Sequence, residues 1–81
     1  MISPAARKLS LRERRCAIGA ILEARFSVGA FEQVRRTNTE YWESPRNDMA
    51  RGIYGEAMRE KQRLANATDA QLRAEIAAAG A

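Results

Sequence analysis

The chain is poor in the residues that carry much of protein chemistry. Histidine is absent, and cysteine occurs once among the 81 residues, as Cys16. The side chain that most often moves protons at neutral pH is therefore missing, and neither an ordinary zinc site nor an internal disulfide can form. Because a lone reduced cysteine is typical of a reducing compartment, we predict a cytoplasmic protein.

Long hydrophobic runs and catalytic motifs are also missing. The longest apolar or small run covers residues 16–22, far short of the roughly 20 residues that cross a bilayer, so we expect no contact with a membrane. There is no phosphate-binding glycine loop, and Glu56 and Glu60 lie one turn apart but next to arginines. We therefore predict that the protein is not an enzyme and holds neither a metal nor a cofactor.

Apolar residues nevertheless make up 46% of the chain. That is enough for one modest core, and the length allows one small domain over residues 1–81, with flexible ends at 1–9 and 78–81. No alternation of period two persists long enough for a strand. The predicted fold class is all-α, a small compact bundle of three to four helices, with marginal stability that docking or homo-oligomerisation would increase.

Capping signals locate the first and last helices. Ser10 and Glu13 have the spacing of a capping box, which predicts a helix over about 11–25. Thr68 and Gln71 form a second box, and a final helix follows that Gly80 ends.

Between these ends, the pattern predicts two further helices. After a break at residues 26–29, a helix runs over about 30–36, and residues 37–39 either continue it or cap a short turn. A serine and a proline then open the longest helix, about 45–65. On that helix we expect these side chains to face the core: Met49, Ala50, Ile53, Tyr54, Ala57, Met58, Leu64 and Ala65.

Positive charge is concentrated in the first half of the chain. Residues 1–40 carry eight basic and four acidic side chains, whereas residues 41–81 carry six of each. The excess gathers between Arg7 and Arg15. Guanidinium groups match carboxylates as well as phosphates, so the patch suits an acidic protein surface or a nucleic acid, and an ordinary solvated helix face has the same pattern.

The segment 22–31 resembles the centre of a helix-turn-helix, in which Leu22, Phe26 and Val28 straddle the turn. Ser27 stands where that motif usually has glycine, and Glu23 where it usually has a small residue. The resemblance implies a DNA-reading helix over 30–36. A plain helical hairpin is the interpretation that we favour, and the sequence leaves both open.

Two further features suggest contact surfaces. Tyr41 and Trp42 beside Arg46 could stack on bases or anchor a partner, although a lone tryptophan more often ties helices together in the core. Gly52 and Gly55 fall on the polar half of the long helix, at a cost of about 1 kcal/mol each relative to alanine. They suggest either a smooth docking strip between arginines or a simple bend.

These observations predict a non-enzymatic interaction protein, an adaptor, inhibitor or assembly component of the kind that phages and other mobile elements encode, acting in the host cytoplasm or in a virion. The partner is expected to be a protein, bound through Arg7, Arg12, Arg14, Arg15, Arg51, Gly52, Gly55, Arg59 and Arg63. The alternative is a helix-turn-helix-like transcriptional regulator that binds nucleic acid through Arg25, Arg35, Arg36 and Arg46. A homo-oligomer is compatible with either.

Overall fold

The computed structural model describes residues 8–80, which form an elongated all-helical fold with Cα extents of 55 × 21 × 19 Å. The elements are α1 (Leu11–Phe26), α2 (Val28–Thr37), α3 (Thr39–Glu43), the 3-10 turn η2 (Pro45–Asn47), α4 (Asp48–Ala65) and α5 (Asp69–Ala79). The predicted fold class is confirmed, with the short helix α3 added to the four longer ones.

Both predicted capping boxes are present. The Ser10 hydroxyl accepts from the Glu13 amide at 3.1 Å, and the Glu13 carboxylate accepts from the Ser10 amide at 3.1 Å. Thr68 and Gln71 make the same reciprocal pair at the start of α5. These bonds satisfy backbone donors that a helix start leaves free. The starts of α1 and α5 could therefore be predicted from the sequence.

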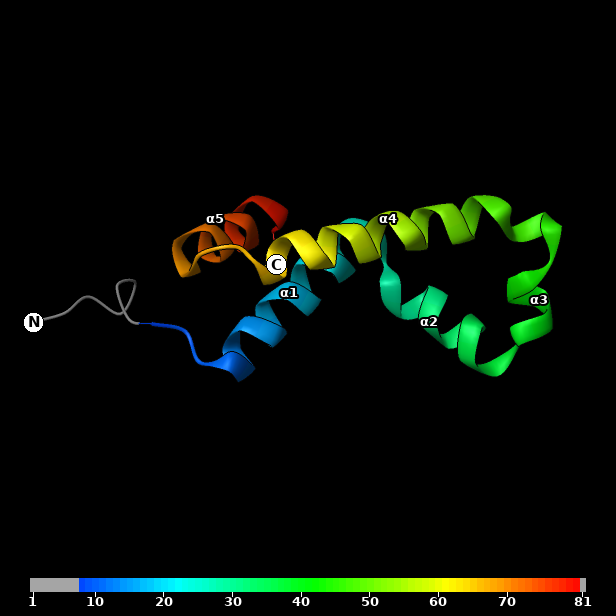
Figure 1. Cartoon of the computed structure of the whole chain (residues 1–81), viewed down its shortest axis with the longest axis horizontal. Coiled ribbons are helices and arrows are strands. Elements are labelled where there is room, and N and C mark those ends of the chain that lie inside the picture. The colour runs from blue at the N-terminus through cyan, green and yellow to red at the C-terminus, as the bar shows by residue number, and fades with distance from the viewer. Residues whose placement is uncertain (1–7, 81) are drawn as a thin grey trace, which may run out of the picture.

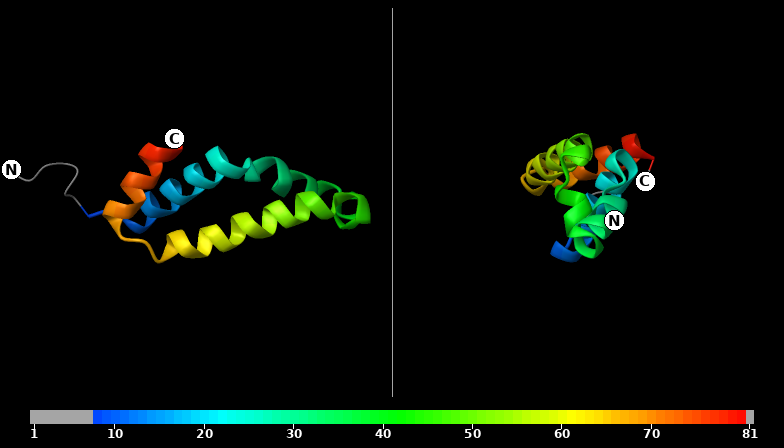
Figure 2. Two further views of the ribbon diagram at one scale, coloured as in Figure 1. Left: turned by 90° about the horizontal axis from the view of Figure 1, so that it is seen from above. Right: turned by 90° about the vertical axis from the view of Figure 1, so that its right-hand side faces the viewer.

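The long helix α4 runs antiparallel to α1 and α2. Figures 1 and 2 show α1 and α2 advancing along the molecule one after the other, while α4 returns beside both and α5 folds back against α1. The predicted hairpin of the first two helices is therefore wrong, because α2 does not return along α1. One residue, Ser27, separates them, in the left-handed conformation at φ 54° and ψ 45°.

The main core lies at the end of the molecule where α1, α4 and α5 meet. Its buried side chains are Ile21, Leu22, Leu64 and Leu72, and the partly buried residues around them are Leu9, Ile18, Phe26, Val28, Ala67 and Ile76. One leucine from each of the three helices packs into this core, so α5 is part of the core although it lies at the end of the described chain.

An aromatic cluster holds the opposite end together. Trp42 is 8% exposed, and its ring lies 5.5 Å from that of Tyr54, edge to face, and 6.1 Å from that of Phe31. These three rings come from α3, α4 and α2, so Trp42 has the structural role of a core tryptophan. Its indole is consequently not presented for base stacking.

Three of the predicted core residues of the long helix are exposed. Met49 is 80% and Ile53 is 37% exposed, and Ala65 is exposed as well, whereas Ala57 and Leu64 are fully buried. The first half of α4 packs against α2, η2 and Trp42 of α3, and these elements leave Met49 exposed within the described residues. The apolar face predicted for the long helix is therefore wider than the face that the described neighbours cover.

Candidate interaction surfaces

Arg14, one of the predicted partner-binding residues, links α1 to the loop between α4 and α5. Its Nη1 donates to Asp69 Oδ1 at 2.6 Å, and its Nη2 donates to the Ala67 carbonyl at 2.6 Å. Asp69 also accepts from the backbone amide of Leu9 at 2.8 Å. That amide and the guanidinium hold the pKa of Asp69 below its ordinary value. Most of the donors of Arg14 are therefore used inside the molecule.

Arg25 and Arg63 converge on one carboxylate. Glu75 of α5 lies 3.1 Å from Nη2 of Arg63 and 2.5 Å from Nη2 of Arg25, and Arg63 also pairs with Glu60. Hydrogen bonds from the two guanidiniums lower the pKa of Glu75, and the bond from Arg63 has the larger effect. This network ties α5 to both α1 and α4, although Arg63 remains 53% exposed.

Arg51 fixes the turn that leads into α4. Its Nη1 donates to the carbonyls of Trp42 at 2.6 Å and Ser44 at 2.7 Å, and its other terminal nitrogen pairs with Asp48. Carbonyls left free by the end of α3 are satisfied in this way. The side chain lies on the flank of α4 that faces α3, apart from the glycine strip with which it was grouped.

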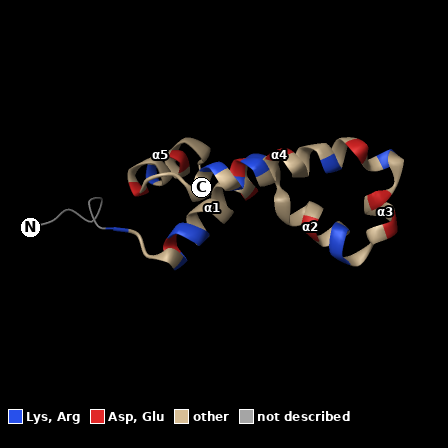
Figure 3. Ribbon diagram, viewed as in Figure 1, with Lys and Arg blue, Asp and Glu red and all other residues tan. Residues whose placement is uncertain are grey.

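Arg12, Arg15 and Arg59 differ from these arginines. All three side chains are exposed, and none makes an ion pair or a side-chain hydrogen bond with any other residue between 8 and 80. Arg12 and Arg15 lie one turn apart at the start of α1, where basic residues are visible in Figure 3. Arg7, predicted to extend this patch, lies outside the described residues.

Gly52 and Gly55 share the outward face of α4 with Arg59 and Arg63. A Cβ added at Gly52 would meet no atom within 4 Å, and one at Gly55 would meet only Nη1 of Arg59, at 3.9 Å. Neither glycine is therefore required by close packing within the described part of the molecule. Both lie inside the uninterrupted helix Asp48–Ala65, so the predicted alternative of a break is not observed.

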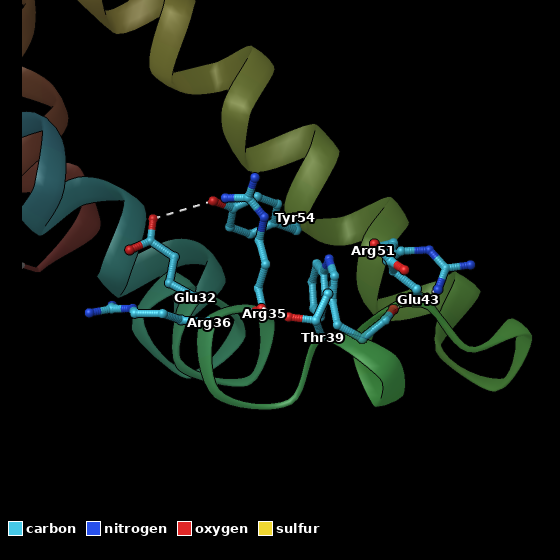
Figure 4. A pocket seen from close by; sticks show the side chains of 8 residues that line it. Glu32, Arg35, Arg36, Thr39, Glu43, Arg51 and Tyr54 are labelled. Carbon is cyan, nitrogen blue, oxygen red and sulfur yellow. Dashed lines mark hydrogen bonds between the residues drawn. The ribbon is translucent and has the colours of Figure 1, made fainter.

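The basic residues assigned to nucleic acid are divided among different environments. Arg35, Arg36 and Arg46 are all exposed, and the guanidinium of Arg35 lies over the ring of Tyr54, 5.8 Å from its centroid. Arg35 and Arg36 border an open groove of about 770 Å³ between α2, α3 and α4 (Figure 4), in which the Tyr54 hydroxyl donates to Glu32 at 3.4 Å. The helix joint has one residue, where a helix-turn-helix has a turn of three to four.

Sequence reasoning missed a second groove, between α1 and α4. It has a volume of about 390 Å³ and is lined by Arg15, Ile18, Gly19, Leu22, Val28, Glu32, Met58 and Lys61. The stripe of Leu11, Ile18 and Leu22 on α1 was visible in the sequence, and Leu11 is 64% exposed in the fold. The apolar stripe of α1 is thus left partly uncovered by the other described helices.

Comparison of the chain with protein-family models, with curated proteins and with solved structures gave no match. Among the helices between residues 8 and 80, none combines the length and the hydropathy that crossing a bilayer requires.

Proposed function

We propose that this chain is a small non-enzymatic interaction protein that docks a protein partner through exposed arginines. The observation that carries the proposal is the division of the arginines into two sets. Arg14, Arg25, Arg51 and Arg63 make hydrogen bonds or ion pairs that hold the helices together. Arg12, Arg15 and Arg59 make none within the described residues and are exposed, as are Arg36 and Arg46.

The docking surfaces in this proposal are two. One is the start of α1, with Arg12 and Arg15, and the other is the outward strip of α4, with Gly52, Gly55 and Arg59. Arginine on a stable helix suits an interface, because its fork makes directed hydrogen bonds to carboxylates and its stem buries apolar area. Because the two glycines have no Cβ, a partner backbone can come close to the helix at these positions.

A transcriptional regulator remains the second candidate, because Arg36 and Arg46 are exposed basic side chains on the same end of the molecule. It has less support than a protein-docking role. Arg25 is held by Glu75, Arg35 lies over Tyr54, and the joint at Ser27 is a single residue.

Capture from a lysate of the source organism, with and without nuclease, separates the two candidates. We expect one stoichiometric protein to remain bound after nuclease treatment, and to be released only gradually as salt rises from 50 to 200 mM. A nucleic-acid contact that neutralises six to ten phosphates would weaken by about 10³–10⁵ over that range. Loss of every captured component on nuclease treatment would overturn the proposal.

A further inference from the structure

From the groove between α1 and α4 we infer a docking site for an acidic amphipathic helix of the partner protein. The inference rests on the proposed function and specifies what its α1 surface binds. The α1–α4 pair has two flanks. One is covered by α5, through Leu72 and the Glu75 network, and the other is the open groove.

Apolar side chains form much of the lining of the groove. Ile18, Leu22 and Val28 come from α1 and the start of α2, and Met58 comes from α4. Leu22 is 3% exposed, so the groove reaches the main core, while Ile18 and Val28 are only partly buried. Residues 18–26 of α1 span about 12 Å of helix, which matches a little over two turns of a helix laid along the groove.

Gly19 lines the groove. It lies in the middle of α1, where glycine costs about 1 kcal/mol relative to alanine, and a Cβ added there would meet no atom within 4 Å. Packing inside the described residues therefore does not require glycine at this position. Its missing side chain keeps one wall of the groove low.

The charges at the rim determine the chemistry of the occupant. Arg15 and Lys61 stand on the two walls, and Arg12 lies one turn before Arg15. The one acid that lines the groove, Glu32, already accepts from Tyr54 at 3.4 Å. A second copy seated groove to groove would set Arg15 and Lys61 against their own counterparts, whereas a helix with an apolar stripe and flanking carboxylates would pair with them.

The test is a selection followed by binding measurements on the full chain. A display library of helix-stapled peptides, randomised on all faces, is selected against the wild-type protein. We expect the enriched peptides to carry apolar residues at i, i+3 or i+4 and i+7, with glutamate or aspartate beside them. Enrichment of peptides without acidic residues, or of none with that spacing, would overturn the inference.

Two pairs of variants then locate the binding of the best synthetic peptide by fluorescence anisotropy. Gly19→Trp should weaken binding at least tenfold by filling the groove, whereas Gly19→Ala should not, and the open space at this position favours folding of both. Arg15→Glu with Lys61→Glu should weaken binding at least tenfold, whereas Arg36→Glu with Arg46→Glu should leave it unchanged. Equal affinities within both pairs contradict the site.

Failure here and failure of the proposed function are distinguishable. If the peptide does not require the groove while the nuclease-resistant partner is still captured, the groove inference falls and the docking function stands. If no protein partner is captured, the proposed function falls with it.

Discussion

Replacing Gly52 and Gly55 together with alanine should stabilise the protein. Both residues lie in the interior of α4, which runs without interruption from Asp48 to Ala65. A Cβ at Gly52 finds open space, and a Cβ at Gly55 approaches only the flexible end of Arg59, at 3.9 Å, an ordinary van der Waals separation. Neither substitution introduces a clash, so the helix propensity decides the sign of the effect.

The expected magnitude follows from that propensity. Alanine is favoured over glycine inside a helix by about 1 kcal/mol, so the double variant should gain about 2 kcal/mol in free energy of unfolding. For a domain of this size, 1 kcal/mol shifts the Tm by about 4–8 °C, which predicts a rise of about 8–16 °C. Thermal unfolding followed by circular dichroism measures it, with each single variant as a check on additivity.

A Tm that stays the same or falls would refute the reasoning, because it would mean that packing or the unfolded state outweighs propensity at these positions. The same variant also tests the docking strip. A higher Tm together with reduced partner binding supports a strip that a partner backbone approaches. A higher Tm with unchanged binding would exclude Gly52 and Gly55 from the interface.

Three further predictions concern stability. Ser27→Gly should raise the Tm by about 2–8 °C, because the left-handed conformation costs a residue with a Cβ about 1–2 kcal/mol. The greater conformational entropy of glycine in the unfolded chain offsets part of this gain in stability. Leu72→Ala should cost about 2–5 kcal/mol, because its side chain is fully buried between three helices. Asp69 and Glu75 have lowered pKa values in the fold, so their contribution is present at neutral pH and is lost as the pH falls below about 4, through the folded pKa values.

Thermal melts and urea titrations check these three expectations. Ser27→Ala is the control for the first, and a lower Tm for Ser27→Gly than for Ser27→Ala would contradict it. An exposed-site substitution such as Ala74→Ser is the control for Leu72→Ala, and equal stability of the two would contradict the core assignment. Asp69→Asn should flatten the loss of stability between pH 5 and pH 2, and an unchanged profile would count against the role of Asp69.

The helix limits were predictable where a local signal sets them. The capping boxes at Ser10 and Thr68 act between residues three apart, so the sequence alone contains the whole interaction. The single-residue joint at Ser27 was not predictable in the same way. The joint has short-range bonds, from the Ser27 amide to the Glu23 carbonyl at 3.0 Å and from the Gly29 amide to the Glu23 carboxylate at 2.8 Å. These involve a serine and a glutamate at positions where no familiar capping motif signals them, so the sequence predicted a break over 26–29 but not its length.

The candidate surfaces were only partly predictable, for a similar reason. Composition marks arginines but does not say which find an acidic partner, and the partners of Arg14 and Arg25 lie 50 or more residues along the chain, at Asp69 and Glu75. The α1–α4 groove needs two helices and the absence of a third on one flank. The one sign of this groove in the sequence was the apolar stripe on α1.

The most direct test of the central claim is the amount of partner retained from nuclease-treated lysate by charge-reversed proteins. The variants are Arg12→Glu with Arg15→Glu for the α1 surface and Arg59→Glu for the α4 strip, with Arg36→Glu plus Arg46→Glu as the matched control. We predict that at least one of the first two loses the partner while the control keeps it, all three remaining folded by circular dichroism. Retention of the partner by both surface variants would contradict the account, and so would its loss in the control alone.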